Sequence, residues 1–205
     1  MREPKRIGVL ISGRGSNMLS LAAACRSGRI NGRIALVVSN KKNAPGLQAA
    51  AEMGLQTQFI SHRAFDSRDL FDHAVVEALN ARRVDLVCLA GFMRLLSPTF
   101  IRAFRNRIMN IHPALLPAFP GLRGQRQAIE YGVKVSGATV HFVDEELDHG
   151  PIIIQRAVPV GEGDTEETLS ERILKIEHEA YPEAVSLFCD GRLRVEGRRV
   201  IVAPK

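Results

Sequence analysis

Short apolar runs rich in β-branched residues alternate with helix-like segments through the first half of the chain. Four such runs are found, at residues 6–12, 33–39, 57–61 and 84–90. Three helix-like segments separate them, at residues 17–28, 45–54 and 66–83. The first two segments end at glycines, the second begins with Pro45 and the third opens on Asp66, which are ordinary helix boundaries. Because strands that alternate with helices form parallel sheets, the pattern predicts an α/β fold.

The second half continues with mixed elements. We expect a short helix at 98–105, strands at 107–111, 136–143 and 152–160, a helix at 125–131, a long helix at 165–189 and a hairpin at 192–202. Asp164 and Glu167 predict a capping box for the long helix, Pro182 predicts a bend, and Glu196 with Gly197 predicts the hairpin turn. Residues 1–205 are therefore expected to form one doubly wound, mostly parallel α/β domain, with a nucleotide-type, Rossmann-like half over about 1–100 and a site-bearing half over about 101–205.

Composition favours a small anionic ligand over nucleic acid. The 205 residues carry a net charge of +6, but the basic residues are scattered and aromatic side chains make up only 5%. The three cysteines form no C-x-x-C pair, so neither a disulfide framework nor a zinc site is indicated. No run of eighteen apolar residues and no signal-peptide pattern is present, which predicts a cytoplasmic protein without a membrane partner.

The stretch SGRGSN, residues 12–17, follows the first predicted strand and opens the first helix. Free main-chain N–H groups and the helix dipole converge at such a turn and favour an anion. A dinucleotide fingerprint would require a third glycine where Met18 stands, and a P-loop would require a Lys-Ser or Lys-Thr pair. A phosphate monoester is therefore expected rather than NAD or ATP. The alternative is a tight turn that binds nothing.

Asn110 and His112 alternate at the end of a predicted strand, so their side chains share one face. Asp148 lies in a predicted turn further along. An amide, an imidazole and a carboxylate suit acyl transfer, which needs donors for an oxyanion and an acceptor for a proton, better than metal binding. Because no serine or cysteine nucleophile is evident, direct transfer between two substrates is favoured. Each of the three residues could instead have only a structural role.

Several motifs in the same order resemble the phosphoribosylglycinamide formyltransferase family. They are VLISGRGSN, FDSR, LAGFMRLLSP, NIHPALLPAFPG, GATVHFVDEELDHGPIIIQ and EHEAYP. The resemblance spans nearly the whole chain. It implies a formyltransferase fold and transfer of the formyl group of 10-formyltetrahydrofolate, as co-substrate, to the amino group of glycinamide ribonucleotide in purine synthesis.

The resemblance also implies roles for individual residues. The catalytic positions are Asn110, His112 and Asp148. The ribonucleotide would be held by Gly15, Ser16 and Asn17 at its phosphate and by Glu177 at its glycinamide end. The folate would be held by Arg68, Met93, Arg94, Leu95, Leu96 and His141, with Arg68 facing the glutamate tail. The chain departs from the family at residues 122–126, LRGQR, and at Leu174, where some members have a lysine.

Three rival functions stay open at this point. Methionyl-tRNA formyltransferase and formyltetrahydrofolate hydrolase share the formyl-transfer core but carry additional domains. A non-catalytic nucleotide- or folate-binding module would need only the anion loop and the fold. We expect the partners to be two small-molecule substrates, without nucleic acid or metal, and the chain to be a monomer or a homodimer.

Overall fold

The computed structural model describes residues 3–204, and the ends of the predicted unit, Met1, Arg2 and Lys205, lie outside them. The first half contains β1 (Lys5–Ile11), α1 (Ser16–Arg26), β2 (Gly32–Ser39), α2 (Pro45–Glu52), β3 (Thr57–Phe59), the 3₁₀ turn η1 (His62–Ala64), α3 (Arg68–Ala81) and β4 (Leu86–Leu89). The four predicted strands and three predicted helices are confirmed. Helix α3 starts later than expected, because Ser67 rather than Asp66 caps it by accepting from the N–H of Leu70.

The second half contains α4 (Pro98–Ala103), β5 (Ile108–His112), α5 (Gly124–Tyr131), β6 (Val135–Phe142), β7 (Ile152–Pro159), α6 (Glu166–Cys189), β8 (Leu193–Glu196) and β9 (Arg199–Val202). Two local predictions are wrong. The capping box of α6 is formed by Thr165 and Thr168, because Asp164 pairs with Arg172 instead. The hairpin turns at 197–198, since Glu196 pairs with Arg199.

All the strands form one nine-stranded sheet with the order β3-β2-β1-β4-β5-β6-β7-β9-β8. The first five strands in this order, from β3 through β2, β1 and β4 to β5, are parallel, as predicted. Strand β6 is antiparallel to both β5 and β7. The chain leaves β1 toward one edge of the sheet and returns at β4 toward the other. The carboxyl ends of β1 and β4 therefore meet at a topological switch point, where open α/β sheets bind ligands.

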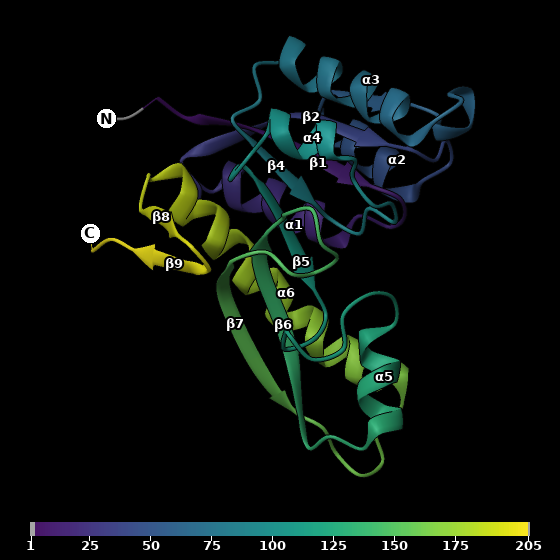
Figure 1. Cartoon of the computed structure of the whole chain (residues 1–205), viewed down its shortest axis with the longest axis vertical. Coiled ribbons are helices and arrows are strands. Elements are labelled where there is room, and N and C mark those ends of the chain that lie inside the picture. The colour runs from purple at the N-terminus through teal and green to yellow at the C-terminus, as the bar shows by residue number, and fades with distance from the viewer. Residues whose placement is uncertain (1–2, 205) are drawn as a thin grey trace.

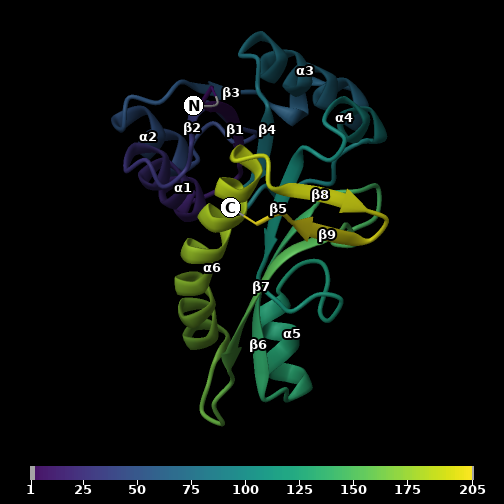
Figure 2. The ribbon, with the colours of Figure 1, turned by 90° about the vertical axis from the view of Figure 1, so that its left-hand side faces the viewer.

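Helices cover both faces of the sheet (Figures 1 and 2). On one face, Ile7, Val9 and Ile11 of β1 join a buried core that includes Met18 of α1 and Tyr181 of α6. On the other face, Leu10 joins a core built from α3 and α4. Gly8 lets α3 approach closely, because a Cβ there would lie 2.5 Å from Leu79 Cδ2. In Figure 1, β6 and β7 extend beyond this layered region with α5 and α6 beside them.

Within residues 3–204, no helix has the length and apolar character needed to cross a bilayer.

Candidate active site

The predicted anion loop lies between the end of β1 and the start of α1. Gly15 precedes α1 in the left-handed region, with φ +72°, and no side chain caps the helix. The loop packs on the start of α2, where the Gly46 N–H donates to the Gly13 carbonyl at 3.0 Å. A Cβ at Gly46 would lie 2.9 Å from two carbonyl oxygens of the loop. Gly15 is therefore required for its positive φ and Gly46 for its close contact with the loop, and the N–H groups of α1 stay available to an anion.

Ser12 ties the loop to the rest of the site, a role that the sequence did not reveal. Its hydroxyl donates to Asn40 Oδ1 at 2.7 Å and accepts from the Met93 N–H at 2.9 Å. Its own N–H donates to the Gly91 carbonyl. Ser12, Asn40 and Gly91 each follow a parallel strand, and the shared edge of the sheet brings them together. The anion loop and the segment after β4 are thus held as one unit.

Glu177 of α6 lies against the anion loop. The Asn17 side-chain amide donates to Glu177 Oε2 at 2.8 Å, and both residues are buried. Burial raises the pKa of the Glu177 carboxyl to about 7, and the Asn17 hydrogen bond only partly opposes this effect. Asn17 Oδ1 is also buried, and no donor reaches it from the described residues. The pair therefore presents unused acceptor capacity to a ligand.

Tyr181, one turn beyond Glu177, fixes α6 against the sheet. Its buried hydroxyl lies 3.0 Å from the Leu89 carbonyl and 2.9 Å from the Met109 carbonyl. These carbonyls belong to β4, one of the two strands at the switch point, and to its neighbour β5. The contact sets the height of Glu177 relative to the ends of both strands.

Asn110, His112 and Asp148 come together, as the sequence analysis expected. Asp148 Oδ2 lies 3.2 Å from His112 Nδ1, and Asp148 Oδ1 accepts from Asn110 Nδ2 at 3.4 Å. The Gly121 N–H donates to Asp148 Oδ2 at 2.8 Å, so the carboxylate is held from the segment that follows β5. The Asp148 side chain is only 10% exposed and does not point into solvent.

The His112 ring is placed between two acceptors. Nδ1 faces the Asp148 carboxylate, and Nε2 lies 2.8 Å from the Phe119 carbonyl oxygen. A neutral imidazole has one N–H donor, whereas the imidazolium has two. The cationic ring therefore satisfies both neighbours, and its side chain is 5% exposed.

His141 lies beside Asn110, because the two residues are paired in the β5–β6 ladder. Its Nδ1 lies 2.8 Å from the Phe142 carbonyl, and its Nε2 lies 3.3 Å from Asn110 Nδ2. A neutral ring with the proton on Nδ1 matches this donor and acceptor pattern. Burial lowers the pKa of His141 and so favours the same neutral form.

A cavity of about 290 Å³ opens beside the cluster. Asn110 and Asp148 line one part of it. The predicted folate residues Arg68, Arg94, Leu95, Leu96 and His141 line it as well. Met93 is not among the lining residues. The residue is 62% exposed, and its main-chain N–H donates to the Ser12 hydroxyl.

Asp72 of α3 supports the wall of this cavity and was not found from the sequence. The Ser97 N–H donates to Asp72 Oδ2 at 2.5 Å, and the carboxyl is buried. Burial raises the pKa of Asp72, while the positive charges of Arg68 and Arg94 oppose the shift. Arg94 also packs over the Phe71 ring at 5.2 Å. Asp72 lies on the inward stripe of α3 among Phe71, Val75, Val76 and Leu79, so a carboxylate at an otherwise apolar position was the signal that could have found it.

No group of three or more histidine, cysteine, aspartate or glutamate side chains within 3–204 is arranged to hold a metal ion.

Residues 5–185 match the formyl transferase family. The chain is 49% identical over 203 residues to a trifunctional purine biosynthetic protein of Drosophila pseudoobscura pseudoobscura, covering 98% of this chain but only 15% of the fly protein. It is 46% identical over 189 residues to phosphoribosylglycinamide formyltransferase of Escherichia coli, covering 92% of this chain and 89% of that protein.

The fold is shared with solved structures at high identity. A glycinamide ribonucleotide transformylase from Symbiobacterium toebii superposes with a TM-score of 0.98 at 55% identity, covering 100% of this chain and 96% of that one. The match includes both halves of the sheet and the loops of the site. The chain belongs to the formyl transferase family and, within it, to the phosphoribosylglycinamide formyltransferases.

Proposed function

We propose that the chain transfers the formyl group of 10-formyltetrahydrofolate directly to the amino group of glycinamide ribonucleotide. The observation that carries the proposal is the meeting of Asn110, His112 and Asp148 at the wall of a cavity near the anion loop. Donors, a cationic ring and a proton acceptor surround one point, which is what attack of an amine on a carbonyl requires. The relatives with the printed activity support the same reaction.

The ribonucleotide would bind with its phosphate at the start of α1. Main-chain N–H groups at Gly15, Ser16 and Asn17, together with the Ser16 hydroxyl, are the donors there. The Asn17 amide group is already used by Glu177, so we assign Asn17 a main-chain contact with the phosphate. The acceptors left on Asn17 and Glu177 would take N–H donors from the glycinamide end.

The folate would fill the cavity beside Asn110. Leu95 and Leu96 offer apolar surface to its ring system, and Arg68 and Arg94 offer positive charge to its carboxylates. His141 is buried, and burial favours its neutral form. It would orient the Asn110 side chain rather than supply a positive charge. Met93 would contribute through the main chain, because its side chain does not line the cavity.

In the reaction, the substrate amine forms a bond to the formyl carbon, and the carbonyl oxygen becomes an oxyanion. Asn110 and His112 would donate hydrogen bonds to it. His112 Nε2 faces the Phe119 carbonyl, so the oxyanion would replace that carbonyl as acceptor. Asp148 would stabilise the cationic ring and relay a proton from the attacking nitrogen, through water, to folate N10. The carbon–N10 bond then breaks, which releases tetrahydrofolate.

We also propose that the chain acts in the cytoplasm as a monomer or homodimer, as one domain with a phosphate-binding half and a catalytic half. No nucleic acid, membrane or metal takes part in this proposal. These statements rest on the sequence expectations.

One spectroscopic assay tests the function against its rivals. Purified protein is mixed with 10-formyltetrahydrofolate alone, with glycinamide ribonucleotide or with methionyl-tRNA, and tetrahydrofolate formation is followed. We expect turnover only with the ribonucleotide. Turnover without it would indicate a hydrolase, turnover that requires a methionyl-tRNA would indicate the tRNA enzyme, and binding without turnover would indicate a binding module.

A further inference from the structure

The segment 143–150 carries Asp148, yet much of it lies at the surface. Val143 and Asp144 are half-buried, and residues 145–147 are exposed. Both ends of the segment are fixed. At one end, the Val143 N–H donates to the Ile108 carbonyl. At the other end, Gly150 packs so closely on the Phe142 carbonyl oxygen that a Cβ would lie 1.9 Å from it. Between these ends the chain places Asp148 in the left-handed region, with φ +50°. For a residue other than glycine this conformation is strained and must be held by its surroundings.

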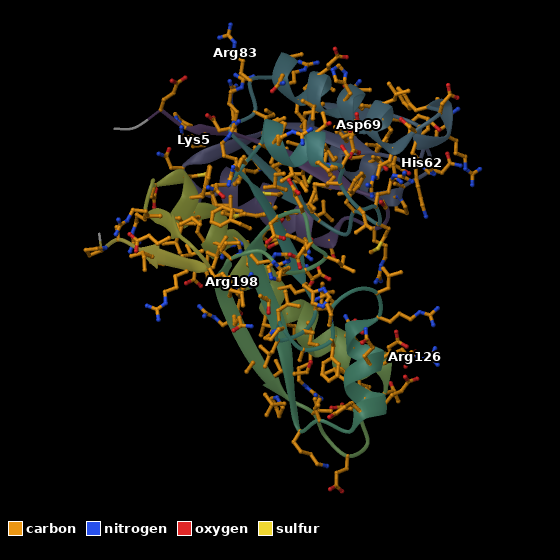
Figure 3. All side chains as sticks on the ribbon, viewed as in Figure 1. Lys5, His62, Asp69, Arg83, Arg126 and Arg198 are labelled. Carbon is orange, nitrogen blue, oxygen red and sulfur yellow. The ribbon has the colours of Figure 1, made fainter. Side chains whose placement is uncertain are left out.

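Arg198, labelled in Figure 3, lies at the turn of the β8–β9 hairpin and contacts this segment from the far end of the chain. Arg198 Nη2 donates to the His149 carbonyl at 2.6 Å, and Nη1 lies 2.8 Å from His149 Nε2 and 3.1 Å from Nδ1. The hairpin itself is joined to the sheet where Arg199 of β9 pairs with Ile152 of β7. One guanidinium therefore contacts both the main chain and the side chain of the residue that follows Asp148.

Within the segment, His149 connects Arg198 to Asp144. Its Nδ1 lies 2.9 Å from Asp144 Oδ2, and the other oxygen of Asp144 accepts from the Glu146 N–H at 3.1 Å. The Nδ1 N–H donates to Asp144, while the Arg198 guanidinium lies against both ring nitrogens. The series Arg198, His149 and Asp144 thus closes the loop across its exposed outer side, while Gly121 holds Asp148 on the inner side.

We propose that Arg198 is a positioning residue for the reaction: through His149 it holds the 143–150 segment in the conformation that places the Asp148 carboxylate at His112. The proposal rests on the proposed role of Asp148. It gives the basic C-terminal hairpin a function that does not require a nucleic acid or a second protein. Because the same segment lines the folate cavity, folate binding depends on this contact, whereas the ribonucleotide site at α1 does not.

The test compares Arg198→Ala with Arg199→Ala, which removes the same charge from the neighbouring exposed position. For Arg198→Ala we expect kcat to fall by about ten- to a hundred-fold, the cost of misplacing a reacting group by up to an ångström. The KM for 10-formyltetrahydrofolate should rise, and the KM for glycinamide ribonucleotide should stay unchanged. Arg199→Ala should keep the kinetics of the parent. Arg198→Lys should recover part of kcat, since one ammonium can replace one of the two contacts.

Two further variants separate positioning from a general loss of structure. In an Asp148→Asn background, Arg198→Ala should lower kcat no further, because the carboxylate that it positions is already gone. Arg198→Ala combined with His149→Ala should be no worse than the more damaging single variant, since both act through one contact. Thermal unfolding of each variant is measured alongside.

Three results would overturn the inference. The first is an unchanged kcat for Arg198→Ala while Asp148→Asn is inactive. The second is an equal loss of kcat in the Asp148→Asn background, and the third is an equal loss for Arg199→Ala. If Asp148→Asn itself keeps normal turnover, the proposed mechanism fails instead, so the two failures are distinguishable.

Discussion

The anion loop at 12–17 presents main-chain N–H groups to a ligand, whereas the cluster of Asn110, His112 and Asp148 presents side chains. The loop is local in sequence, and two glycines and a helix start suffice to define it. The cluster joins residues up to 38 positions apart and needs main-chain partners at Phe119 and Gly121 to hold it. A phosphate already carries its charge and needs only fixed donors, while a reacting carbonyl needs groups that respond to developing charge.

The two regions also differ in the surroundings that they give to a buried carboxyl group. Glu177, beside the loop, has a single donor from Asn17, and burial raises its pKa to about 7. Asp148, in the cluster, has an N–H donor from Gly121 and faces the His112 ring. The environment of Glu177 favours a neutral carboxyl, whereas the proposed mechanism uses the charge of Asp148. The comparison predicts that removing charge is tolerated at one position and not at the other.

The largest expected effect is that of Asp148→Asn. The amide cannot accept the relayed proton or stabilise a cationic His112, so kcat should fall by about a hundred- to ten-thousand-fold, the range for general acid–base groups. Both KM values should change little, because ground-state contacts are largely kept. Steady-state kinetics with both substrates measure this. Glu162→Gln, at an exposed carboxylate far from the cavity, is the control, and turnover equal to that control would remove Asp148 from the mechanism.

Asn110→Ala should follow in size. Losing one oxyanion donor costs about two to three orders of magnitude in kcat in other acyl-transfer enzymes. Asn110 also donates to Asp148, so a small part of the loss comes from a less well held carboxylate. Asn80→Ala, at an exposed position near the end of α3, is the matched control and should behave as the parent. Near-normal turnover of the Asn110 variant would exclude the amide as an oxyanion donor.

The anion loop depends on neighbouring residues and the cluster on distant ones, and this difference explains which features could be predicted from the sequence. The alternation of strands and helices predicts the parallel half of the sheet, and the glycines at 13 and 15 predict the anion loop. Both predictions succeed because these features depend on local geometry. Ser12 and Asp72 were missed because their partners, Asn40 and Ser97, lie 28 and 25 residues away. Nothing in the sequence alone joins Asp148 to His112; the family resemblance supplied that pairing.

The wrong capping-box prediction has the same origin. Asp164 fits a capping box by spacing, but Arg172, two turns into α6, takes its carboxylate in a two-pronged ion pair with distances of 2.6 and 2.9 Å. Thr165 and Thr168 then form the capping box in its place. A side chain eight residues away decided between two locally reasonable caps, which spacing rules do not consider.

Glu177→Gln tests the contrast through stability. The folded pKa of about 7 lies above the usual 4.5, so between these values the folded state binds more protons than the unfolded state. Stability from this group is therefore present below about pH 4.5 and is lost as pH rises toward 7. A shift of this size corresponds to about 3 kcal/mol at most. Urea unfolding from pH 4.5 to 7.5 should show the parent losing stability relative to Glu177→Gln, and parallel curves would contradict the raised pKa.

Ser16→Ala should have the smallest effect and should be confined to the ribonucleotide. The hydroxyl is one donor among several main-chain N–H groups at the start of α1, and a hydrogen bond to a charged group contributes about 1.5 kcal/mol or somewhat more, so KM for glycinamide ribonucleotide should rise roughly ten-fold. The values of kcat and of KM for the folate should stay near those of the parent, because the phosphate contact is the same in the ground state and the transition state. Ser27→Ala, at the opposite end of α1, is the control. A rise confined to the folate KM would assign the loop to the other substrate and would reverse the division between the two regions.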